Sequence, residues 1–145
     1  MSEQLMNNVK ITLVKAAQTA GTNCVTTEII DMAGFEGVVF FGTIAIAGYG
    51  NFIYAQQDDD PAMKTGDILV GSQVTAAANG QVVWLDIYKP EKRYLCACIN
   101  RTLSTATGDI YAIQYQGRKG LISNLVANKL IGEILISPDD GPAEY

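Results

Sequence analysis

The densest group of chemically capable side chains in this chain is acidic. Asp58, Asp59 and Asp60 stand together, and Asp67 follows seven residues later. A calcium ion takes about six to eight oxygen ligands, which an EF-hand loop supplies from alternate positions and a closing glutamate. This segment has neither that spacing nor the glutamate. We therefore expect an acidic, solvated loop that discourages edge pairing, and no metal site.

Three cysteines, Cys24, Cys96 and Cys98, are the next candidates for chemistry. Cys96 and Cys98 lie two apart in a strand-like run, which puts them on one face with Cα atoms about 6.6–6.8 Å apart. That separation is at the limit of disulfide geometry. Without histidine or paired Cys-x-x-Cys motifs, a zinc site is unsupported. We predict three reduced packing cysteines and no cofactor.

Nucleophilic and nucleotide chemistry also lack their usual partners. The chain contains no histidine, so Ser72, Ser104 and Ser123 have no imidazole base. Residues 48–53 (GYGNFI) begin like a dinucleotide fingerprint but lack its third glycine and open no helix. The sequence therefore favours a protein that is not an enzyme, with no catalytic residues.

Composition narrows the class further. The 145 residues fit one domain, and the net charge of -5 argues against a nucleic-acid partner. Charged residues make up 17% of the chain, below the usual level of about 25%. Low charge indicates that part of the surface is covered in an assembled state. The polar residues 1–8 contain no signal peptide, so we expect synthesis in a reducing cytoplasm.

Residues 37–55 carry no charge over nearly the length of a membrane span. Four glycines and a turn-like Gly48-Tyr-Gly-Asn51 interrupt the run, however. Two strands joined by a turn explain the pattern better, and no membrane partner is expected.

Strand patterns cover most of the remaining chain. Residues 9–15 place Val9, Ile11 and Leu13 on one face of a half-buried strand. Further strands are predicted at 24–30, 36–46, 52–57, 81–88, 92–100, 109–116 and 131–136, with a short strand or helical turn at 68–70. Eight or nine short strands predict a single-domain, antiparallel, all-β fold, a β-sandwich or jelly roll. The body spans 9–137, between a flexible N-terminal arm (1–8) and a C-terminal tail (138–145).

The strand predicted at 36–46 is apolar on both faces, which indicates burial on both sides or an oligomer contact. We expect a homo-oligomer, with contacts also made by the two ends of the chain. The predicted interface residues are Leu5, Met6, Phe40, Phe41, Ile44, Pro138 and Tyr145. Arg93, in an otherwise apolar strand, is predicted to form a structural ion pair with Asp86 or Asp59 that fixes a loop.

Several segments, taken in order, resemble a family of small virion proteins of tailed bacteriophages. Residues 30–40 (IDMAGFEGVVF) are similar to its D-x-x-G-(F/Y)-x-x-V run, and residues 56–60 (QQDDD) to a strand end. Residues 85–95 (LDIYKPEKRYL) resemble the stretch leading into its Arg-Tyr strand, and residues 137–142 (SPDDGP) its short ending. Where members often carry a basic residue after the Arg-Tyr pair, this chain has Cys96.

The resemblance implies a β-sandwich that decorates the capsid exterior as a cement protein, bound to the major capsid protein and to neighbouring copies. A neck, tail or fibre-associated subunit is the alternative among structural proteins. In another class, a carbohydrate-binding β-sandwich or enzyme would line a groove with Trp84 and Tyr88. Trp84 alternates with Val82, which favours packing in the core.

Overall fold

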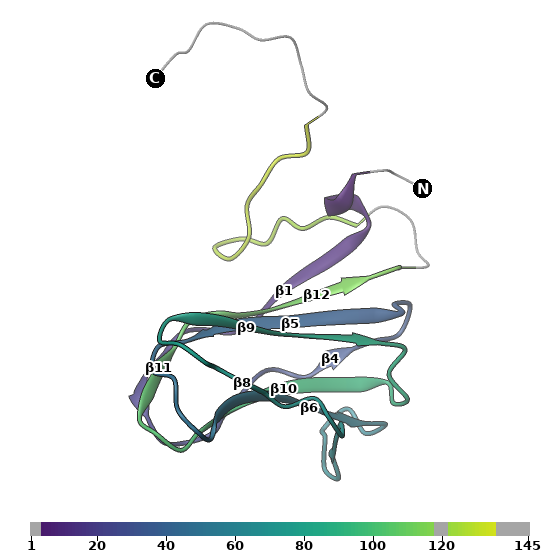
Figure 1. Cartoon of the computed structure of the whole chain (residues 1–145). Helices are drawn as coiled ribbons and strands as arrows, with labels where there is room; N and C mark the ends of the chain where they lie inside the picture. The colour runs from purple at the N-terminus through teal and green to yellow at the C-terminus, as the bar shows by residue number, and fades with distance from the viewer. Residues whose placement is uncertain (1–3, 118–121, 136–145) are drawn as a thin grey trace, which may run out of the picture.

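A computed structural model of the chain describes residues 4–117 and 122–135. In these residues, 12 strands form two antiparallel six-stranded sheets packed as a sandwich, one of them curled into a half-barrel (Figure 1). The described residues contain no α-helix, and the 3-10 helix η1 (Leu5–Asn7) precedes the first strand. The predicted all-β sandwich is confirmed. Its strands outnumber the predicted eight or nine because six of the 12 are only two to four residues long.

Sheet A runs in the order β1-β12-β5-β11-β2, and β9 pairs with the opposite edge of β5. The bounds of its strands are β1 (Val9–Lys15), β2 (Gln18–Gly21), β5 (Gly37–Ile44), β9 (Gln81–Tyr88), β11 (Thr105–Thr107) and β12 (Ile110–Tyr115). β1 and β9 are therefore the two long outer strands of the sheet.

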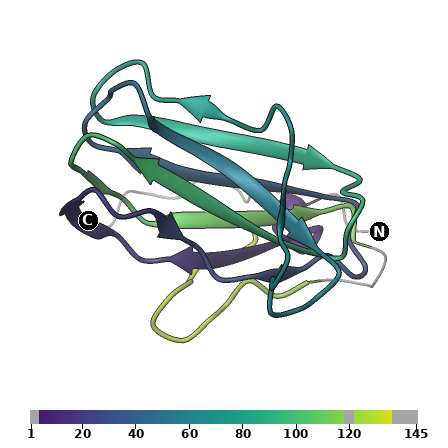
Figure 2. The same ribbon diagram turned by 90° about the horizontal axis from the view of Figure 1, so that it is seen from below.

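Sheet B is centred on β10 and β6, which pair along their full lengths. Its strands are β3 (Val25–Thr26), β4 (Ile30–Asp31), β6 (Asn51–Asp58), β7 (Asp67–Ile68), β8 (Val74–Thr75) and β10 (Tyr94–Arg101). Viewed from below, the strands of sheet B lie across those of sheet A (Figure 2).

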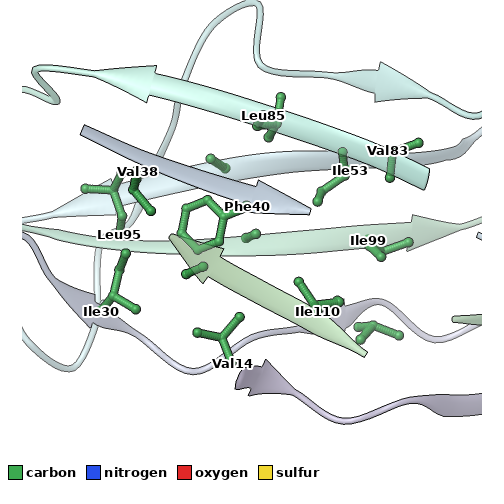
Figure 3. Packing of buried hydrophobic residues seen from close by; sticks show 14 of the residues in the cluster. Val14, Ile30, Val38, Phe40, Ile53, Val83, Leu85, Leu95, Ile99 and Ile110 are labelled. Carbon is green, nitrogen blue, oxygen red and sulfur yellow. The ribbon is translucent and has the colours of Figure 1, made fainter. Parts of the chain in front are cut away.

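One hydrophobic core fills the space between the sheets. Phe40 lies among Leu85 and Ile110 of sheet A and Leu95 and Ile99 of sheet B (Figure 3). Strand alternation puts every second side chain of β5 into this core.

Two predicted interface residues belong to this core. Phe40 and Ile44 are fully buried between the sheets, so the prediction that they contact a partner is wrong. Phe41 points to the other, outer face of sheet A, where it is half-buried.

The predicted strands 9–15 and 81–88 match β1 and β9 residue for residue. The segment 24–30 splits instead into β3 and β4, and β2 lies between the predicted strands 9–15 and 24–30, where no strand is predicted. The strand predicted at 131–136 is not formed: 131–135 have no regular structure, and residue 136 is outside the described residues. The tail 138–145, with Pro138 and Tyr145, also lies outside them.

The uncharged run at 37–55 forms β5, a turn and the start of β6, as predicted. Gly50 adopts a φ of 92° in the turn, a conformation open chiefly to glycine. In the described part of the chain, no helix has the length and apolar character needed to cross a membrane.

Candidate interaction surfaces

The outer face of sheet A presents large apolar side chains to solvent along β9. Val83 and Leu85 point into the core, so their neighbours Val82 and Trp84 point outward and are 54% and 61% exposed. Tyr88, on the same face, is 54% exposed. The prediction that Trp84 packs in the core is therefore wrong: alternation was correctly recognised, but it does not say which face is buried.

Two pairs of aromatic rings continue this outer face across β5 and β12. Phe41 and Tyr111 stack with ring centroids 5.6 Å apart, and Tyr88 and Tyr115 with centroids 6.5 Å apart. The Tyr115 ring crosses β5 directly over Gly37, where any Cβ would collide with it. Glycine at this position is what allows the Tyr115 ring to reach β9.

The Tyr115 hydroxyl donates a hydrogen bond of 2.6 Å to Asp86 on β9. Burial, followed by this hydrogen bond, raises the pKa of Tyr115 to about 12, so the donor stays protonated at neutral pH. The Tyr115 hydroxyl therefore holds the Asp86 carboxylate on the outer face of sheet A.

Residues 122–135, named here the C-terminal arm, extend beyond β1 on the side of sheet A that faces away from sheet B (Figure 1). Its apolar side chains are largely in solvent: Leu125 is 62% exposed, Ile131 97% and Leu135 63%. A mostly apolar cavity of about 550 Å³ separates the arm from Met6 and β1. The arm thus lies near the sandwich without closing on it.

Two predicted interface residues lie beside this cavity. Met6 lines it, and Leu5 occupies the same short helix η1 with 69% of its surface exposed. The segment predicted as a flexible N-terminal arm is therefore a 3-10 turn at residues 5–7, and residues 1–3 lie outside the described part of the chain.

Asn124 fastens the C-terminal arm to the outer edge of β1. Its Oδ1 accepts the backbone N–H of Ile11 at 2.7 Å, and its Nδ2 donates to the carbonyl oxygens of Val9 and Met6 at 2.8 Å each. One amide side chain thus takes the place of a neighbouring strand at this edge. Sequence reasoning missed Asn124, because no local pattern marks a contact between residues 113 positions apart.

Arg93 forms its ion pair with Asp31. Its Nε and Nη2 donate to the two carboxylate oxygens at 2.9 Å each, and these hydrogen bonds hold the pKa of Asp31 below its usual range. The predicted partners are wrong: Asp86 accepts from Tyr115, and Asp59 accepts only the Arg93 backbone N–H while pairing with Lys92. Asp31 is opposite Tyr94 in the β4–β10 pairing, which brings it beside Arg93.

The acidic segment after β6 is held by its own backbone. Asp58 accepts the backbone N–H groups of Asp60 and Thr65 at 3.0 Å each, and these hydrogen bonds lower the pKa of Asp58. Across residues 4–117 and 122–135, no three acidic, cysteine or histidine side chains are grouped so that they could hold a metal ion. The geometry is that of a capped loop.

The three cysteines gather on the outer side of sheet B as free thiols. Cys96 and Cys98 are buried, whereas Cys24 is exposed with its Sγ 4.0 Å from the Tyr54 hydroxyl. The Cys96 thiol donates to Gln56 Oε1. The interaction with Cys96 lowers the pKa of Cys98, and burial raises that of Cys24. Solvent barely reaches Cys98, which is 2% exposed.

Comparison with known proteins assigns no role to these surfaces. No protein-family model matches the chain, and no curated protein is detectably similar to it. The resemblance to virion proteins of tailed phages therefore depends on the sequence motifs, and the surfaces are interpreted from their own geometry.

Proposed function

We propose that this protein is a structural virion component of a tailed bacteriophage. In this role it is a capsid decoration (cement) protein that binds the outside of the major capsid shell and stabilises the contacts between capsomers. The proposal includes synthesis in the host cytoplasm, assembly with neighbouring copies, and a jelly-roll order of strands in the sandwich.

The observation that carries the proposal is the apolar cavity of about 550 Å³ between η1, β1 and the C-terminal arm. Exposed Leu5 and Leu125 lie on the two segments that border it. Contiguous apolar surface of this kind marks a site where another protein binds. An extended loop of a capsid protein, with two or three apolar side chains, has the dimensions to fill it.

The arrangement around the cavity suits a protein that reinforces a shell. Asn124 already fastens the arm to β1, so a partner that enters the cavity pays less of the ordering cost of about 1–2 kcal/mol per residue. The net charge of -5 favours a protein surface over DNA as the partner.

Binding to capsids that lack the decoration protein tests the proposal. In Leu5→Lys and Leu125→Lys, a charge would be placed at the border of the cavity, and we expect affinity to fall at least tenfold in co-sedimentation. Val70→Lys is the matched control, because Val70 is fully exposed elsewhere on the surface. Unchanged affinity in both variants, or location on the tail by electron microscopy of virions, would reject capsid decoration.

A neck, tail or fibre-associated subunit is the outcome indicated by location on the tail. The exposure of Trp84 and Tyr88 on the same face of β9 favours a second candidate, a carbohydrate-binding module, because sugars stack on exposed aromatic rings. Titration with a panel of bacterial surface glycans would support it only if binding is seen and is lost in Trp84→Ala.

A further inference from the structure

The outer edge of β9 is a long strand edge without a neighbour. All eight residues, Gln81–Tyr88, pair with β5 on one side. No strand in the described residues pairs with the other side. Proteins usually protect such edges by making them short, charged or covered. β9 is long, and its only charged residue, Asp86, is held by Tyr115.

A groove follows this open edge. Its volume is about 480 Å³, and its lining includes Val74 and Ala77 from the neighbouring segment and residues 81–86 of β9. Most of the lining is apolar. An incoming strand would therefore meet both unpaired backbone groups and apolar side chains, the two features by which proteins add a strand to a sheet edge.

The far part of the C-terminal arm has the complementary properties. Residues 131–135 (IGEIL) have a sequence typical of a strand, yet they form none with the described residues. Ile131 is 97% exposed, Ile134 44% and Leu135 63%. Within the described residues, the segment pairs with no strand, and Gln4 Nε2 donates a hydrogen bond to the Leu135 carbonyl oxygen at 3.2 Å. A β-branched and apolar segment of this kind is suited to be a donor strand.

The arm of the same chain is attached on the wrong side of the sheet to serve β9. Asn124 fixes it to the outer edge of β1, and β12 and β5 lie between β1 and β9. In Figure 1 the arm also leads away from the body of the sandwich. Beside the open edge, the described residues place β8 (Val74–Thr75), which lines the groove without pairing with β9.

We propose that residues 131–135 of a second copy of this chain add as a strand to the outer edge of β9. The apolar side chains of the donor then cover the groove and Trp84, and the backbone groups of β9 gain partners. If the first copy donates its residues 131–135 to β9 of the second, the two copies form a closed dimer. If it donates them to a third copy, the contacts form a ring.

The area that the contact can bury is in the range that a stable interface needs. Six exposed apolar side chains take part: Val82, Trp84, Tyr88, Ile131, Ile134 and Leu135. Each would lose roughly 100 Å², given that a whole aromatic side chain offers about 150–250 Å². Two reciprocal contacts then reach about 1,200 Å², the lower end of specific interfaces.

The contact goes beyond the proposed function and can be tested without a capsid. Sedimentation velocity of the purified protein is expected to show association that weakens at least tenfold in a donor variant, Ile131→Lys/Leu135→Lys, and in an acceptor variant, Val82→Lys/Trp84→Lys. Val70→Lys is the control and should associate like the wild type. All substituted side chains are half exposed or more, so each variant is expected to fold. Circular dichroism checks that it does.

Mixing the two defective variants makes the test specific. The donor variant keeps an intact β9 and the acceptor variant keeps an intact arm, so the mixture should recover one contact per pair. Hydrogen exchange should show slower exchange at β9 amides in the mixture than in either variant alone.

Three results would overturn the proposal. The first is a monomeric wild type at about 100 μM, above the typical Kd of a weak specific interface. The second is association lost in the acceptor variant alone, which indicates that two β9 edges pair with each other. The third is protection of β9 in a monomer, which indicates that the chain's own arm pairs there. Ile131 and Ile134 also line the cavity of the proposed capsid contact. Because capsid binding is measured with Leu5 and Leu125, and the acceptor variant leaves that cavity unchanged, either proposal can fail while the other stands.

Discussion

The two outer edges of sheet A differ in whether the backbone groups along them have hydrogen-bond partners. At β1, Asn124 satisfies the backbone N–H of Ile11 and the carbonyl of Val9, and the Glu28 N–H bonds the carbonyl of Val14, so this edge is covered by other parts of the chain. At β9, an edge of eight residues carries Trp84 and Val82 in solvent, and no strand of the described residues pairs with its outer side. A side chain outside any strand thus decides which edge of the sheet remains available for a partner.

Comparing the β1 and β9 edges distinguishes contacts that stabilise the folded monomer from surface that remains available to a second molecule. The closed edge belongs to the folding of the monomer, because its hydrogen bonds join segments distant in sequence. At the open edge, Tyr88 and Asp86 contact Tyr115 of the same chain, whereas Val82 and Trp84 remain largely in solvent. Both edges depend on the same core beneath them.

A cavity in the core beneath both edges would cause the largest loss of stability and would weaken β1 and β9 alike. Phe40→Ala deletes a fully buried ring and is expected to reduce the free energy of unfolding by about 3–5 kcal/mol. Chemical denaturation measures the loss, and hydrogen exchange should increase at β1 and β9 alike. Phe41→Ala is the control on the outer face of the same strand, with an expected loss of about 1 kcal/mol. Equal losses in the two variants would contradict the assignment of faces.

Opening the β1 edge alone would have an intermediate effect. Asn124→Ala removes three hydrogen bonds to backbone groups, and we expect a loss of about 1–2 kcal/mol because part of this is regained by hydration. Amide exchange at Ile11 should become faster while β9 is unchanged. Ser123→Ala, next in the chain and exposed, should leave both quantities unaltered. No change in exchange at Ile11 would show that Asn124 does not close the edge.

The smallest loss of stability is expected at the edge of sheet B, where the contact is the Arg93–Asp31 ion pair and not a neutral amide such as Asn124. Arg93 lowers the pKa of Asp31 in the folded protein, so the pair stabilises the fold above the unfolded pKa of about 3.9. That stability is lost as pH falls through the lower folded value. Asp31→Asn should thus be less stable than the wild type at pH 7 and equal to it near pH 2, in denaturation experiments at each pH.

The contribution of Asn124, which carries no charge, should stay constant over the same range of pH. Asp67→Asn, an exposed acid of the same sheet, is the control for a general charge effect. A difference between Asp31→Asn and wild type that persists unchanged at low pH would exclude the ion pair as its cause.

The sequence predicted the long strands well and the surfaces poorly, for physical reasons. β1 follows from the alternation of apolar and polar residues over 9–13, and β9 from a run of β-branched and aromatic residues that ends at Lys89 and Pro90. Alternation does not say which face is buried, so it places Trp84 in the core although the residue is exposed. In β1 a register irregularity between Leu13 and Lys15 adds a further departure, and Val14 is buried there.

Very short strands and contacts between distant residues leave no pattern in the sequence from which they could be predicted. Strands of two residues such as β3 and β4 are too short to show periodicity, so a single strand was predicted across 24–30. The choice of Asp31 for Arg93 depends on the register of β4 against β10, which is a property of the folded sheet. The capping role of Asn124 depends in the same way on a distant segment.

The position of Trp84 also determines how this protein will look to spectroscopy. It is the only tryptophan in the chain, and its indole lies on the outer face of β9 with 61% of the residue exposed. Its fluorescence therefore resembles that of an indole in water even in the folded protein, and iodide should quench it readily. Unfolding will change this emission little, whereas a molecule that covers β9 will shift it to shorter wavelength and shield it from the quencher.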